Sequence, residues 1–94
     1  MMDQELKQNL HTRLLRIEGQ VRGIRDMLAD DRYCVDVLTQ SRAVAAALRR
    51  VEDLVMRNHL NTCVSEAIRS DDPGAKREKL DEVMAVISRF GNHG

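Results

Sequence analysis

The sequence predicts an all-α fold with three helices in each chain. Three apolar stripes run along it with alternating spacings of three and four residues, and such spacing puts each stripe on one face of a helix. Only Tyr33 and Phe90 are aromatic, so the core must consist of aliphatic residues, which suit helix packing. The 94 residues suffice for one domain, residues 1–94, whose small core would gain from association with further copies.

The first helix is expected over about residues 5–29. Gly19 and Gly23 each cost about 1 kcal/mol relative to alanine inside a helix, which indicates either close approach by another backbone or an exposed face. The polar run 30–32 ends the stripe, and its aspartates Asp30 and Asp31 are candidates for capping the next helix. The stripe consists of Leu10, Leu14, Ile17, Val21, Ile24 and Leu28.

The second helix is unusually long, because residues 33–69 contain neither glycine nor proline. Its stripe consists of Val37, Ser41, Val44, Leu48, Val51 and Val55. A helix of about 36 residues extends ~54 Å, well beyond the core of a monomer of this size. We therefore expect this helix to pack against another chain.

The third helix follows the only clear break after residue 69. Asp72 is expected as its N-cap and Pro73 as its first residue, a position that proline favours. Gly91 is expected to end it. The apolar stripe consists of Leu80, Val83, Met84, Ile87 and Phe90.

Composition narrows the class of protein. Fifteen basic and fifteen acidic residues cancel, so the overall charge indicates no anionic partner. No apolar run approaches the roughly 20 residues that span a bilayer, and the first ten residues lack the apolar core of a signal peptide, so a cytoplasmic protein without a membrane partner is expected. Two cysteines in a reducing compartment favour thiols, metal ligands or redox centres over a disulfide. Enzyme motifs are absent, so we expect no catalysis.

Three residues of the second helix are candidate metal ligands. His59 and Cys63 are four residues apart and therefore share one face. Cys34 precedes His59 by 25 residues, and at ~100° per residue the rotation comes within about 20° of a whole number of turns. The 25 residues from Cys34 to His59 also span ~37 Å along the helix axis, so one straight helix cannot present all three ligands to the same ion. An antiparallel pair of these helices would bring Cys34 of one chain beside His59 and Cys63 of the other, in two identical sites.

Two thiolates and one imidazole are a soft donor set that favours Cu(I). Zinc is the alternative, with water or His11 as a fourth ligand. Taken singly, a cysteine or a histidine is more often a structural residue. In a redox alternative, Cys34 and Cys63 form a disulfide or hold a persulfide, and His59 then has no obvious task.

Clusters of arginine are the only local sign of a nucleic-acid partner. The sequence contains no helix-turn-helix, so contact with DNA would come from basic helix faces. The ordinary alternative is that these arginines are solvated or paired with acids. They are Arg13, Arg16, Arg22 and Arg25 on the first helix and Arg42, Arg49 and Arg50 on the second.

Three segments of the sequence resemble the copper-sensing operon repressor family, CsoR. They are RLLRIEGQVRGI (13–24), RYCVDVLTQSRAV (32–44) and NHLNTC (58–63). The resemblance implies a dimeric four-helix bundle around an antiparallel pair of second helices, usually assembled as a dimer of dimers. It also implies a repressor that binds double-stranded operator DNA without metal, releases it when Cu(I) binds, and thereby controls copper-resistance or export genes.

The resemblance also assigns roles to individual residues. Cys34, His59 and Cys63 match the ligands of the copper branch. The nickel and cobalt branch has histidine at the position of Cys63, the formaldehyde branch has proline where this chain has Met2, and the persulfide branch lacks the histidine.

Further roles follow from the same resemblance. Tyr33 and an early glutamate of the third helix would couple the metal site to the DNA-binding surface. That glutamate is Glu78, although Lys79 can occupy the same place in the alignment. Arg13 and Arg50 are the foremost candidates for contact with DNA. Outside this family, a helical metal-storage or chaperone protein is the rival class.

Overall fold

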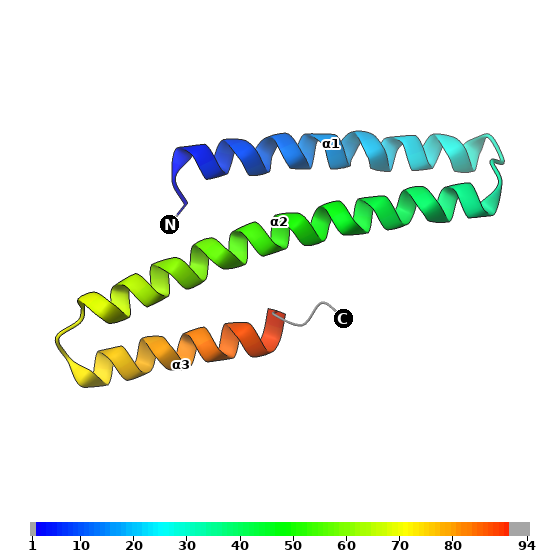
Figure 1. Cartoon of the computed structure of the whole chain (residues 1–94). Helices are drawn as coiled ribbons and strands as arrows, with labels where there is room; N and C mark the ends of the chain where they lie inside the picture. Colours follow the sequence, from blue (N-terminus) through cyan, green and yellow to red (C-terminus); the bar gives the residue numbers. More distant parts are fainter. Residues whose placement is uncertain (1, 91–94) are drawn as a thin grey trace. The chain divides into compact units, whose positions relative to one another are not determined.

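A computed structural model describes residues 2–90, and the chain forms three α-helices within that range (Figure 1). They are α1 (Gln4–Ala29), α2 (Cys34–Arg69) and α3 (Pro73–Phe90), and the described part of the chain contains no strand. The predicted all-α class and the three helices are confirmed, with α2 as one uninterrupted helix of 36 residues. Gly91, the expected end of the third helix, lies outside the described residues.

The turn between α1 and α2 differs from the sequence prediction. Asp30 closes α1 instead of capping α2, because its amide donates to the Asp26 carbonyl at 3.0 Å. Asp31 follows with a φ of 53°, a left-handed conformation that aspartate adopts more readily than most residues. At the start of α2 the carbonyl of Tyr33 accepts the amide of Val37 at 3.2 Å. The aspartates therefore form the turn, and the expectation that they cap α2 was wrong.

The start of α3 matches the prediction. The Asp72 carboxylate accepts a hydrogen bond from the amide of Gly74 at 3.0 Å, and its carbonyl accepts one from Lys76 at 3.0 Å. Asp72 is thus the N-cap, and Pro73 occupies the first helical position, where a missing N–H costs nothing.

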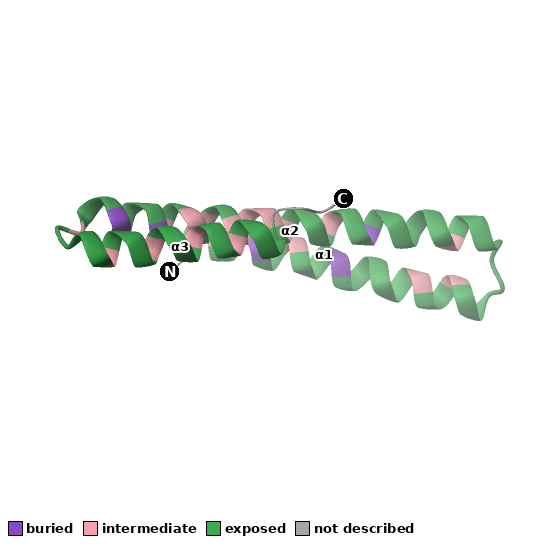
Figure 2. Cartoon of the chain, turned by 90° about the horizontal axis from the view of Figure 1, so that it is seen from below, coloured by how far each residue is buried: buried purple, intermediate pink, exposed green. Residues whose placement is uncertain are grey.

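The described chain divides into two compact units whose boundary lies within α2. The N-terminal unit comprises residues 2–52, with Leu10, Ile17 and Val44 buried. The C-terminal unit comprises residues 53–90, with Cys63 and Ala67 buried. Buried positions are sparse in both (Figure 2). That residues 1–94 act as a single domain stays a prediction.

Many large apolar side chains of the described chain are exposed, so the core of one chain uses only part of the apolar stripes. Apart from the adjacent backbone of the same helix, no described atom lies within 4 Å of the Cβ position of Gly19 or Gly23, so the backbone approach considered for them does not occur among residues 2–90. Within residues 2–90 no helix is long and apolar enough to cross a membrane. The exposed set is Leu14, Leu15, Val21, Leu28, Tyr33, Val35, Leu38, Leu48, Val64, Ile68, Leu80, Met84, Ile87 and Phe90.

Candidate metal centre

His59 and Cys63 form the centre of a polar cluster in the C-terminal unit. They lie one turn apart on α2, and the Cys63 Sγ is 3.5 Å from the His59 Nε2. The Cys63 side chain is buried, with 3% of the residue exposed, whereas His59 is exposed. The spacing of four residues therefore brings a thiol and an imidazole together as predicted, with the ring accessible from outside.

Glu82 of α3 is the third member of this cluster. Its Oε1 lies 3.3 Å from the His59 Nε2, and one donor atom from each of His59, Cys63 and Glu82 falls within 4.8 Å of the others. Sequence reasoning missed Glu82. The register of the α2–α3 hairpin could have indicated it. His59 lies twelve residues before Asp71 and Glu82 lies eleven after it, so the two residues stand at about the same distance from the turn on facing helices.

Lys79 connects this cluster to a second carboxylate on α2. Its Nζ lies 2.9 Å from the Glu66 Oε2 and 3.7 Å from the Glu82 Oε2. The hydrogen bond and charge of Lys79 lower the pKa of Glu66 below its ordinary value of 4.5. The same bond to Glu66 raises the pKa of Lys79 above 10.5. Glu66, Lys79, Glu82, His59 and Cys63 thus form one continuous polar network across two helices.

The Cys63 thiol is stabilised in its protonated form. Burial raises the pKa of Cys63 above its ordinary value of 9.0, and the negative charge of Glu82 adds to this rise. Lys79 acts in the opposite direction but is the smaller influence. A metal that binds Cys63 must therefore displace a proton, as is usual for thiolate ligands.

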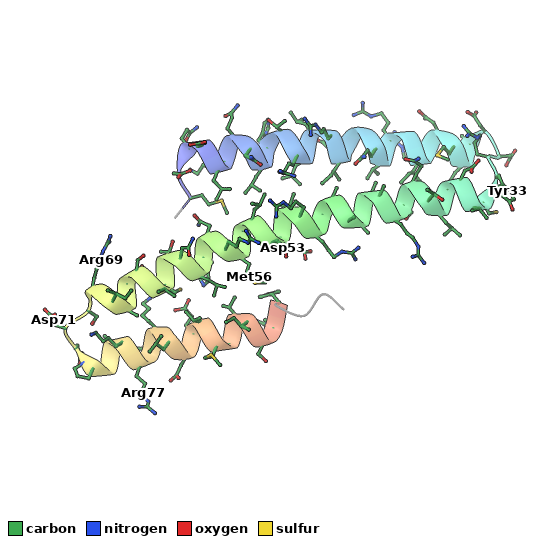
Figure 3. All side chains as sticks on the ribbon, viewed as in Figure 1. Tyr33, Asp53, Met56, Arg69, Asp71 and Arg77 are labelled. Atoms are coloured by element: carbon green, nitrogen blue, oxygen red, sulfur yellow. The ribbon has the colours of Figure 1, made fainter. Side chains whose placement is uncertain are left out.

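The remaining sensing candidates lie elsewhere in the described chain. Cys34 is an exposed thiol at the first residue of α2, in the N-terminal unit. Tyr33, 68% exposed, stands at the turn between α1 and α2 (Figure 3). Glu78 is exposed and outside the cluster, and His11 is exposed on α1. The structure thus brings together His59 and Cys63, with Glu82 instead of Glu78 beside them.

The donor set of the cluster fits a metal ion. A thiolate and an imidazole on one helix face are the donors that copper and zinc select, and both already point at a common space. A half-exposed imidazole leaves an entry path for an ion, and the buried thiol provides a fixed ligand.

The arginines named from the sequence are all in the N-terminal unit. The Nε of Arg13 donates to the Oδ1 of Asn9 at 2.7 Å, a neutral partner that leaves the charge uncancelled. None of the other six forms an ion pair with a residue in the range 2–90. Pairing with acids, the ordinary fate of surface arginine, therefore does not occur for these arginines among the described residues, in contrast to Arg32, which lies 3.8 Å from the Asp36 carboxylate. These six are Arg16, Arg22, Arg25, Arg42, Arg49 and Arg50.

Comparison with known proteins identifies the family of the chain. Residues 6–89 match the family described as metal-sensitive transcriptional repressors. The chain belongs to this family. Its members are repressors and not enzymes, so the resemblance drawn from the sequence and the expectation of no catalysis are both confirmed.

Two curated relatives of this repressor are named as copper sensors. The copper-sensing transcriptional repressor RicR of Mycobacterium tuberculosis is 49% identical over 84 residues, which make up 89% of this chain and 86% of RicR. The copper-sensing transcriptional repressor CsoR of Bacillus subtilis is 43% identical over 84 residues, 89% of this chain and 80% of CsoR.

Two solved structures share the fold. The copper-sensing repressor CsoR with Cu(I) from Geobacillus thermodenitrificans has a TM-score of 0.78 at 43% identity, covering 98% of this chain and 93% of that chain. The nickel-responsive transcriptional regulator InrS has a TM-score of 0.77 at 38% identity, covering 88% and 90%. Sensors of two different metals therefore share this architecture.

Proposed function

We propose that the chain is a Cu(I)-responsive transcriptional repressor that binds double-stranded operator DNA without metal and releases it when Cu(I) binds. The observation that carries the proposal is the 3.5 Å contact between the Cys63 Sγ and the His59 Nε2 in a member of a metal-sensitive repressor family. The relatives RicR and CsoR, both named for copper sensing, support Cu(I) as the metal. Copper-resistance or export genes are the proposed targets.

Cys34 of a second protomer completes the proposed Cu(I) site. Cys34 and His59 are 25 residues apart on one uninterrupted helix, so the same copy of α2 cannot present both to one ion. The exposed Cys34 thiol at the helix start is accessible to another chain. Bound Cu(I) would supply a soft cation that ties thiolates of two protomers to one imidazole.

A homodimer, and a homotetramer built from it, are the proposed assemblies. Fourteen large apolar residues of the described chain are exposed, far more than a small monomer needs to leave in water. The exposed residues Val35, Leu38 and Leu48 lie in the first half of α2, which begins at Cys34, and are candidates for contact with a second copy. Burial of these side chains would stabilise the same assembly that completes the metal site.

Arginines of the N-terminal unit form the proposed DNA-binding surface. Because Arg16, Arg22 and Arg50 form no ion pair with a described acid, their charge is available to phosphates. Arg13, Arg42 and Arg49 complete the proposed set.

A repressor acts where its operator lies, so we propose a cytoplasmic location.

The coupling between metal and DNA is proposed to be negative allostery. Glu82 touches the imidazole of His59 at 3.3 Å, so a metal-driven shift of that ring acts directly on α3. We therefore favour Glu82 over Glu78 as the coupling glutamate, with Tyr33 as its proposed companion. A coupling free energy of about 1 to 3 kcal/mol would weaken DNA binding by roughly 5- to 150-fold.

An anaerobic DNA titration tests the proposal. The fluorescence anisotropy of promoter DNA from the neighbourhood of the chain's own gene is measured with the reduced protein, with and without one Cu(I) per protomer. We expect tight binding of the metal-free protein and release on addition of Cu(I). Equal affinity in both conditions would contradict the mechanism.

One substitution distinguishes a copper sensor from a thiol or persulfide sensor. His59→Ala removes the imidazole and leaves both thiols in place. In a copper sensor this variant responds weakly to Cu(I), whereas a persulfide sensor keeps its full response to a persulfide donor. X-ray absorption of the Cu(I) protein adds a direct measurement: two sulfur ligands and one nitrogen support the site, and a linear two-sulfur centre excludes His59.

A further inference from the structure

We propose that His59, Cys63 and Glu82 of a single protomer form a binding site for a divalent transition-metal cation such as Zn²⁺, which requires no residue of a second chain. All three residues belong to the C-terminal unit, and their donor atoms lie within 4.8 Å of one another. The site shares His59 and Cys63 with the proposed Cu(I) function but does not depend on it. Cys34, which the Cu(I) site needs from a partner, has no part in it.

The distances in the cluster match those of a tetrahedral ion. Zinc bonds of ~2.3 Å to sulfur and ~2.0–2.2 Å to nitrogen and oxygen place adjacent sulfur and nitrogen ligands ~3.5 Å apart, and nitrogen and oxygen ligands ~3.4 Å apart. The Cys63 Sγ is 3.5 Å from the His59 Nε2, and the Glu82 Oε1 is 3.3 Å from the same nitrogen. Two of the three donor separations therefore match a tetrahedral ion, the Cys63 and Glu82 donors lie within 4.8 Å of each other, and a solvent molecule can supply the fourth ligand.

The charges of the cluster suit a dication better than a monovalent ion. A thiolate from Cys63 and the carboxylate of Glu82 together neutralise two positive charges, whereas Cu(I) gains little from a hard carboxylate oxygen. Lys79 contacts the Oε2 of Glu82 at 3.7 Å, so the Oε1 remains directed at the imidazole. The side chains of His59 and Glu82 are 45% and 44% exposed, which leaves the ion access from solvent.

The two metal sites exclude each other because they share the imidazole and one thiol. A divalent ion held within one protomer satisfies His59 and Cys63 without recruiting Cys34 from a partner. Glu82 would therefore decide whether the shared pair holds a divalent ion in one chain or Cu(I) between two chains.

Anaerobic titration of the full-length, reduced protein with Co²⁺, a spectroscopic substitute for Zn²⁺, tests this assignment. We expect one Co²⁺ per protomer, a thiolate-to-cobalt charge-transfer band, and its loss on addition of Zn²⁺. Cys34→Ser should leave the band and the Co²⁺ affinity unchanged. Glu82→Gln should weaken Co²⁺ binding by at least about tenfold, because even supporting residues of metal sites contribute that much.

Two further variants keep the result decisive. Glu82→Ala removes every oxygen donor at that position, so ligation by a glutamine amide cannot mask the effect. Asp81→Asn removes the same charge from the neighbouring exposed position and should bind Co²⁺ like the wild type. Circular dichroism checks that each variant is helical.

Either of two results overturns the assignment: wild-type Co²⁺ affinity in Glu82→Ala, or loss of the charge-transfer band in Cys34→Ser. Cu(I)-driven release of DNA is measured on the unsubstituted chain and does not enter this test. The divalent site and the copper repressor can therefore fail separately.

Discussion

The two units of the chain differ in how the charged residues of their candidate sites are partnered. In the C-terminal unit, Glu66, Lys79 and Glu82 pair with one another and with His59, so their charges are largely satisfied within the fold. In the N-terminal unit, Arg22, Arg50 and four other arginines have no acidic partner among the described residues. Charges that a fold pairs internally set the properties of a site, whereas unpaired charges are available to a partner.

This contrast separates the His59 and Cys63 cluster from the proposed DNA-binding arginines, whereas Cys34 lies in the same unit as those arginines. The His59 and Cys63 pair lies in one unit and the proposed DNA-binding arginines lie in the other, and among the described helices only α2 belongs to both. Substitutions can therefore be chosen that affect one function and leave the other intact.

Cys63→Ser should produce the largest effect. It removes the buried ligand and with it the roughly 5- to 150-fold weakening of DNA binding that Cu(I) is expected to cause. Anisotropy titrations with and without Cu(I) measure the ratio of affinities, which should fall to about one. DNA affinity of the metal-free variant should equal that of the wild type. A variant that loses DNA binding without metal would break the separation between the two units.

Arg50→Ala should have an intermediate effect that is confined to DNA. Loss of one phosphate contact should reduce the slope of log affinity against log salt concentration by about one. The Cu(I) affinity should not change. Arg77→Ala is the matched control, because it removes an exposed arginine from the C-terminal unit (Figure 3). Equal slopes for the two variants would mean that net charge, and not the arginines of the N-terminal unit, determines binding.

Glu66→Gln should give the smallest effect, visible in the pH dependence of stability. Lys79 lowers the pKa of Glu66 in the folded chain, so the pair stabilises the fold above about pH 4.5 and loses that contribution as the pH falls through the lowered value. Thermal unfolding should give a lower Tm for the variant than for the wild type at pH 7, and the two values should converge once the pH falls below the lowered pKa of Glu66. A difference that persists in acid would mean that the Glu66 carboxylate charge does not act through Lys79.

Most of the fold could be predicted from local sequence signals. Apolar stripes and the absence of breakers over residues 33–69 gave the three helices, and the Asp72–Pro73 pair gave the start of α3. Asp30 and Asp31 were misassigned because an aspartate suits a helix start and a left-handed turn residue alike, and packing decides between them.

The site was predictable only where one helix determines it. His59 and Cys63 share a face through their spacing of four residues, which any α-helix of this sequence preserves. Glu82 belongs to another helix, and its position depends on how the α2–α3 turn sets the register of the hairpin. The alignment to a resembling family pointed to residues 78 and 79 instead, because similarity over the first two helices does not fix the length of that turn.

The difference in exposure between the two cysteines has a consequence for their reactivity. Cys63 is buried and its raised pKa keeps the thiol protonated, whereas Cys34 is exposed. Oxidants and alkylating reagents attack accessible thiolates, so in a single chain they meet Cys34 first. Chemical damage would thus remove the ligand offered to a neighbouring chain while the shielded thiol survives, and brief alkylation offers a way to label Cys34 selectively without altering the sequence.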